Sequence, residues 1–214
     1  MQWLLENWKK IAIIGLGELI CMGNVVDKLI NQLIINNIVP YNMKDEYKYA
    51  LDKIVERTVS YLVIFIISVL FNIFLPTFIF LLCFCSLRGC TGGFHFNSYI
   101  KCLFSTIAIY IVFIISIYPW LYNNSEYLPY ILIASVIIIL LVGSINHPNM
   151  NWDENEEYEA NKAARILLFL QGTCIFLCIE LNINKTCLIF AIFGISLCAI
   201  SLIIAKICRQ EVSG

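Results

Sequence analysis

The chain has 214 residues, of which 60% are hydrophobic and only 14% are charged, and its formal net charge is −1. Soluble domains usually carry about 25% charged residues, so this composition excludes an ordinary soluble protein. It predicts instead a membrane protein, whose surface is largely solvated by lipid. The charge gives no indication of nucleic acid as a partner.

Residues 1–57 are predicted to form amphipathic helices on the cytoplasmic face of the membrane. Apolar side chains recur there at helical spacing in a first stripe, which consists of Val25, Val26, Leu29, Ile30, Leu33 and Ile34. A second stripe leads towards the first span and consists of Tyr47, Leu51, Ile54 and Val55. Helices of this kind lie in the headgroup plane more often than they span a bilayer. Packing of the same stripes against the bundle is a compatible alternative.

The apolar run 58–87 is long for one span, and residues 72–76 interrupt it with Asn72 and Pro76. Proline removes a backbone donor and disfavours helix at the residue before it. The run is therefore either one long kinked helix or a hairpin with a full first span and a short, partly re-entrant second one. The hairpin is favoured, because it leaves Lys185 as the only basic residue outside the cell.

Four further segments are long and apolar enough to span a membrane, and they cover residues 103–120, 130–145, 166–181 and 187–205. We therefore expect an all-α, multi-pass helical bundle of about six spans over residues 58–214. Both termini and the polar segment 88–102 are predicted to be cytoplasmic. The acidic run 153–159 is interpreted as a solvated cytoplasmic loop, with peptide recognition as the alternative.

Most of the ten cysteines lie in apolar runs, where a thiol behaves as a small hydrophobic side chain. They lack the regular spacing of a secreted disulfide framework. Cys83, Cys85 and Cys90 fit no standard zinc spacing, and His95 is the only histidine near them. We therefore expect neither a metal nor a cofactor.

The polar segment 88–102 contains His95 and Cys102, the two residue types that thiolate catalysis requires. The imidazole takes the thiol proton, and the thiolate attacks an acyl carbon. A continuous helix would separate the two residues by about 10.5 Å along its axis, whereas proton transfer needs about 3 Å. Gly92 and Gly93 predict a turn instead, because glycine adopts backbone conformations that are closed to other residues.

Asn97 or Ser98 can cap a helix that begins after this turn. Cys102 would then lie in the first helical turn, where the positive end of the helix favours a thiolate, and His95 would fold back from the preceding loop. Arg88 either binds a substrate carboxylate or an oxyanion, or marks the membrane boundary as a snorkelling side chain. From chemistry alone, a structural histidine and one more buried thiol remain alternatives for His95 and Cys102.

Arg88, Gly93, His95 and Cys102, in this order and spacing within a membrane protein, resemble the pattern of the accessory gene regulator B family. The chain length, the hydropathy and the amphipathic N-terminal region extend this resemblance over most of the chain. The family comprises the membrane endopeptidases of Gram-positive quorum sensing. The resemblance implies that an AgrD-like precursor peptide with an internal cysteine is cleaved near its C-terminus.

The resemblance further implies an acyl-enzyme thioester, which the internal cysteine of the peptide displaces to close a thiolactone ring. Cys102 would be the nucleophile and His95 the general base, with Arg88, Gly93 and Gly92 as supporting residues. It also implies a homodimer.

Two other functions remain open, a six-helix peptide transporter and a non-catalytic membrane scaffold or sensor. Ion-coupled transport requires ionisable residues in mid-membrane, but the chain has few, and Glu180 lies near the end of a span. A scaffold would tolerate the substitution Cys102→Ser.

Overall fold

The computed structural model describes residues 26–36, 38–94, 99–145, 153–181 and 183–208. The chain divides into two compact units, Met1–Val59 and Ser60–Gly214. Every regular element in the described ranges is a helix. This confirms the predicted all-α class.

The first unit contains a helix over residues 26–35, the 3-10 turn η1 (Tyr41–Met43) and the beginning of α2 (Lys44–Leu70). Val26 and Ile30, from the first predicted apolar stripe, are buried. An ion pair of 2.5 Å between the Lys48 ammonium and the Asp27 carboxylate joins the two helices. The interfacial role of this region stays a prediction.

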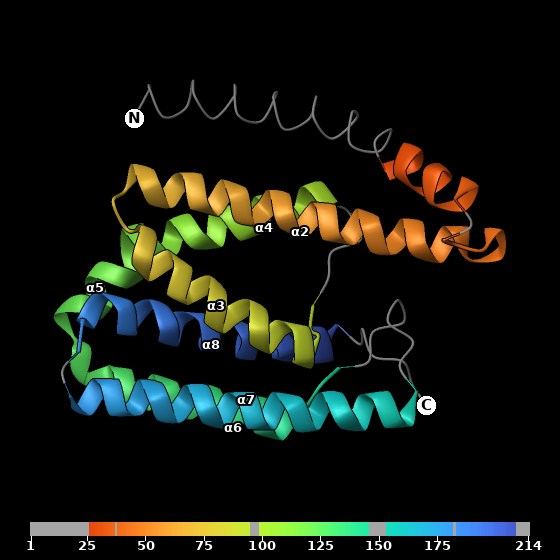
Figure 1. Cartoon of the computed structure of the whole chain (residues 1–214). Coiled ribbons are helices and arrows are strands. Elements are labelled where there is room, and N and C mark those ends of the chain that lie inside the picture. Colours follow the sequence, from red (N-terminus) through yellow and green to blue (C-terminus); the bar gives the residue numbers. More distant parts are fainter. Residues whose placement is uncertain (1–25, 37, 95–98, 146–152, 182, 209–214) are drawn as a thin grey trace. The chain divides into compact units, whose positions relative to one another are not determined.

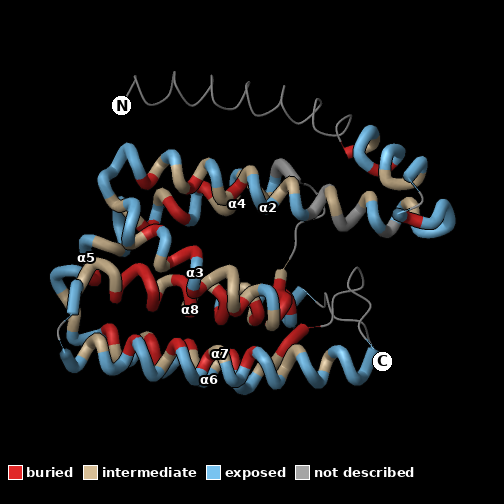
Figure 2. The backbone as a smooth tube through the Cα atoms, viewed as in Figure 1, coloured by how far each residue is buried: buried red, intermediate tan, exposed pale blue. Residues whose placement is uncertain are grey.

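In the second unit, α8 (Lys185–Ile207) is the central helix (Figure 1). It packs against α3 (Phe74–Thr91), α6 (Leu128–Val142) and α7 (Glu154–Glu180). In its most apolar window 56% of the residues are buried, against at most 33% in the other spanning helices. Figure 2 shows this buried strip running along α8. The remaining helices therefore turn most of their apolar side chains outwards, as lipid-facing helices do.

Glycine allows a close approach of α8 to α3. A Cβ atom at Gly194 would lie only 2.9 Å from the carbonyl oxygen of Phe80. Small residues at helix crossings permit this kind of backbone contact in membrane bundles.

Within the described residues, five helical segments are long and apolar enough to cross a membrane: Phe74–Thr91, Lys101–Asn123, Ser125–Val142, Glu154–Glu180 and Lys185–Ile207. They agree with the expected multi-pass bundle of about six spans. The second of them consists of α4 (Tyr99–Val112), the π-helical turn η2 (Phe113–Ile117) and α5 (Tyr118–Asn123). The third begins with the 3-10 turn η3 (Ser125–Tyr127) and continues as α6.

The run 58–87 forms two helices, α2 and α3, as the favoured interpretation predicted. They are separated at Asn72, whose φ of 54° lies in the left-handed region. The expected lengths were wrong, however. The second helix is the full span, whereas residues 58–70 are the short apolar end of α2. The apolar end follows the charged N-terminal part of the same helix without a break. The sequence therefore contains no turn or cap that would mark the beginning of a span.

The interpretation of the acidic run as a loop was also wrong, because α7 begins there. Asp153 is its N-cap: its side chain accepts a hydrogen bond of 2.7 Å from the Glu156 N–H, and the Glu156 side chain accepts one from the Asp153 N–H at 3.1 Å. Such a capping box satisfies two backbone donors that have no partner within the helix. Acidic residues in the first turn also interact favourably with the positive end of the helix.

Candidate active site

The C-terminal ends of α3 and α6 lie beside α7 and α8 on one side of the second unit, and hydrogen bonds link the four helices. The Ile145 N–H donates to the Thr91 carbonyl at 2.9 Å, which joins the end of α3 to the segment after α6. The Ser144 N–H donates to Oδ1 of Asn161 in α7 at 2.8 Å. Arg88 of α3 reaches Ser201 of α8. The predicted polar segment 88–102 begins at this junction.

The turn that the two glycines predicted is present. Helix α3 ends at Thr91, and Gly92 and Gly93 follow with φ values of 66° and 123°. A Cβ at Gly92 would lie 2.7 Å from the Ile145 carbonyl oxygen. Both the backbone conformation and the lack of space therefore require glycine at position 92.

Arg88 fixes the chain just before His95. Its Nη1 donates a hydrogen bond of 2.6 Å to Oγ of Ser201, and its Nη2 donates to the Phe94 carbonyl. The Phe94 N–H in turn donates to the Ser201 carbonyl at 3.2 Å. These contacts give the half-buried guanidinium an internal structural use, which neither sequence interpretation of Arg88 included. A contact of Arg88 with substrate stays a prediction.

Gly93 lies directly against this guanidinium. A Cβ at position 93 would collide with Nη1 of Arg88 and would lie 2.9 Å from Oγ of Ser201. Arg88 and Gly93 are thus two parts of one arrangement, which explains physically why the sequence pattern contains both.

Cys102 lies in the first turn of α4, as the sequence predicted. Its side chain is partly buried, and its carbonyl oxygen accepts a hydrogen bond of 2.8 Å from Oγ1 of Thr106. The N-terminal end of a helix stabilises negative charge, which suits a thiolate nucleophile. His95 and the predicted caps Asn97 and Ser98 lie outside the described residues, so the pairing of His95 with Cys102 stays a prediction.

Sequence reasoning missed Ser201. It is one of several serines in apolar helices, and 113 positions separate it from Arg88. Neither its spacing nor its surroundings in the sequence distinguish it from Ser196, which bonds to Ser135 of α6 instead. Only the packing of α8 against α3 identifies it.

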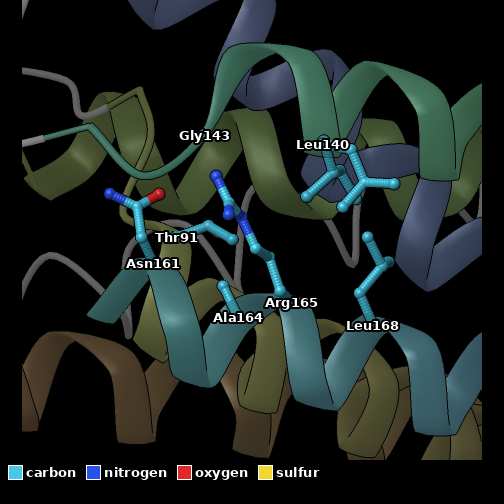
Figure 3. A pocket seen from close by; sticks show the side chains of 8 residues that line it. Thr91, Leu140, Gly143, Asn161, Ala164, Arg165 and Leu168 are labelled. Atoms are coloured by element: carbon cyan, nitrogen blue, oxygen red, sulfur yellow. The ribbon is translucent and has the colours of Figure 1, made fainter. Parts of the chain in front are cut away.

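A small cavity lies beside the junction, between α3, α6 and α7 (Figure 3). Thr91, Gly143, Asn161 and Arg165 are among its lining residues. Its volume of about 10 Å³ is close to the minimum needed for one water molecule. The cavity is therefore far too small to hold a peptide.

The sequence model of the family described as "Accessory gene regulator B" matches residues 24–204, which is most of the chain. No curated protein and no solved structure matches this chain.

Proposed function

This chain belongs to the accessory gene regulator B family, and from that premise we propose that it is a membrane cysteine endopeptidase. Membership of the family gives it a role in processing an autoinducer peptide, with an AgrD-like precursor peptide as its partner. Together with the five apolar helices, it also identifies a multi-pass membrane protein. The proposal adds the chemistry, the residues that perform it and the orientation in the membrane.

In the first step, His95 takes the proton of the Cys102 thiol, and the sulfur attacks the carbonyl carbon of the scissile peptide bond. The bond to nitrogen breaks, and the imidazolium returns the proton to the leaving amine. The C-terminal fragment departs. The N-terminal part remains bound to Cys102 as a thioester.

In the second step, the internal cysteine of the peptide gives its proton to His95 and attacks the thioester carbonyl. Cys102 leaves and recovers a proton, and the peptide closes into a thiolactone. One thioester replaces another, so the exchange is nearly balanced in energy and needs no ATP. Water must be kept away from the intermediate, which a site at the membrane face would favour.

The observation that carries the proposal is the position of Cys102. It lies in the first turn of α4, soon after a turn whose last described residue, Phe94, is held by Arg88 and Ser201. The next residue in the chain is His95. We further propose that both termini and this site face the cytoplasm, which requires the apolar end of α2 (residues 58–70) to cross as a sixth span, and that the protein acts as a homodimer.

The test is mass spectrometry of a synthetic AgrD-like precursor peptide after incubation with the protein in liposomes. We expect cleavage by the wild type and none by Cys102→Ala or His95→Ala. Cys90→Ala is the matched control, because Cys90 is a partly buried thiol of the same polar segment that has no role in the proposed chemistry. Equal cleavage by all four proteins would refute the assignment of Cys102 and His95.

A further inference from the structure

Ser201 of α8 makes two contacts with the segment that precedes His95. Its Oγ accepts a hydrogen bond of 2.6 Å from Nη1 of Arg88. Its carbonyl oxygen accepts the Phe94 N–H at 3.2 Å. Arg88 closes the arrangement, because its Nη2 donates to the Phe94 carbonyl. Side chain and backbone of one residue on the central helix are thus both directed at the same short segment.

The hydroxyl of Ser201 has a second bond, within its own helix. It donates to the Cys198 carbonyl at 2.9 Å, as serines in helices commonly do. With the hydrogen engaged in this way, a lone pair of the oxygen remains available to the guanidinium. The bond to Arg88 is therefore not needed to satisfy the serine, and its effect is to orient the guanidinium.

We propose that Ser201 is a positioning residue of the active site, an inference that rests on the proposed endopeptidase function. The hydroxyl sets the orientation of the Arg88 guanidinium, and the guanidinium holds the Phe94 carbonyl. This fixes the backbone at Phe94, the residue that directly precedes the proposed general base in the sequence. Ser201 acts only through Arg88 and touches neither the peptide nor the thiolate.

The geometry of arginine explains why the hydroxyl matters. A guanidinium is a planar fork with fixed donor directions, so an acceptor at one arm determines where the other arm points. Helix α8 is the most buried spanning helix, and it provides a rigid base for that acceptor. Loss of the Ser201 oxygen would leave Nη1 without this acceptor and let the fork rotate away from Phe94.

Alkylation of Cys102 by iodoacetamide tests this without a substrate. The rate of alkylation is measured at pH 6.5 and pH 9, and mass spectrometry follows each cysteine separately. The exposed Cys208 serves as the internal reference. An ordinary thiol is only about 1% ionised at pH 6.5, so fast alkylation there reports stabilisation of the thiolate, and the His95→Ala variant shows how much of it comes from the imidazole. At pH 9 the thiolate forms without assistance.

We expect Ser201→Ala to lower the rate of Cys102 alkylation about tenfold at pH 6.5 and by less than about twofold at pH 9. Ser201→Thr keeps the hydroxyl and is expected to restore the wild-type profile. The matched control is Ser196→Ala, which removes another hydrogen bond between α8 and a neighbouring helix and is expected to leave both rates unchanged.

If Cys102 of the Ser201→Ala variant is alkylated at pH 6.5 as fast as in the wild type, the positioning role is overturned. An equal fall of the alkylation rate at pH 6.5 and at pH 9 overturns it as well. His95→Ala separates this failure from failure of the proposed function. If His95→Ala lowers the rate at pH 6.5 and Ser201→Ala does not, only the role of Ser201 is lost. If His95→Ala has no effect, the proposed pair of His95 and Cys102 is itself refuted.

Discussion

At the scale of single residues, the candidate site depends on a position where a Cβ atom would displace the Arg88 guanidinium from its hydrogen bonds. Gly93 has a φ of 123°, and a Cβ there would meet the Arg88 guanidinium and the Ser201 hydroxyl. The left-handed region costs an ordinary residue about 1–2 kcal/mol, and the collision adds to this. The sequence predicted the turn correctly, because paired glycines have few other uses, but it contained no sign that one glycine makes room for an arginine.

We therefore expect Gly93→Ala to lower the rate of precursor cleavage at least about tenfold, which corresponds to about 1.4 kcal/mol. Gly89→Ala is the matched control in the same segment, because a Cβ at Gly89 meets nothing within 4 Å. The measurement is the initial cleavage rate in liposomes at equal amounts of inserted protein. Equal rates for the two variants would show that the contact between Gly93 and Arg88 is irrelevant to activity.

At the scale of elements, the close contact of α3 with α8 holds Arg88 opposite Ser201. Gly194 permits this contact, since a Cβ there would lie 2.9 Å from the Phe80 carbonyl oxygen and 3.3 Å from the Cys83 Cβ. The backbone of α3 cannot yield there without moving the helix. Helix packing at Gly194 is thus linked to the geometry of the site.

Gly194→Ala is expected to lower the free energy of unfolding in mixed micelles by about 1–3 kcal/mol, the usual cost of overpacking. It is also expected to lower the cleavage rate. Gly172→Ala on α7 is the control, because its Cβ would meet the nearest Val136 methyl at an ordinary 3.7 Å. If Gly194→Ala were as stable and as active as Gly172→Ala, the close packing of α3 on α8 would not support the site.

The elements also show what sequence patterns could and could not predict. The spans were identified because lipid selects long apolar segments. The start of α7 was missed because a run of acidic residues looks like a loop. It is identified as a helix start only when Asp153 is recognised as the N-cap and Glu156 as its capping-box partner. Ser201 was missed because contacts between distant helices depend on packing and leave no periodic pattern.

At the scale of the whole molecule, the distribution of basic residues predicts the orientation in the membrane. The segment between α5 and α6 contains none, which predicts an extracellular position. The end of α8 carries Lys206, and Arg209 follows in the sequence, which predicts a cytoplasmic position. The helix ends around Arg88 would then lie on the cytoplasmic side.

Labelling with a membrane-impermeant maleimide tests this orientation. We expect the thiol introduced by Asn123→Cys at an exposed position to react in intact cells. The exposed Cys208 at the end of α8 is expected to react only after permeabilisation. Residue-resolved mass spectrometry separates the two sites. Labelling of Cys208 but not of position 123 in intact cells would contradict the orientation.

The central claim is that Cys102 carries the peptide as a thioester, and trapping that intermediate tests it most directly. An AgrD-like precursor whose internal cysteine is replaced by alanine cannot close the ring, so the acyl-enzyme is expected to accumulate. We predict that Cys102 gains the mass of the N-terminal fragment minus one water, that hydroxylamine releases the adduct, and that Cys102→Ala prevents it. An adduct that persists in Cys102→Ala, or peptide cleavage by the wild type with no adduct at Cys102, would contradict the account.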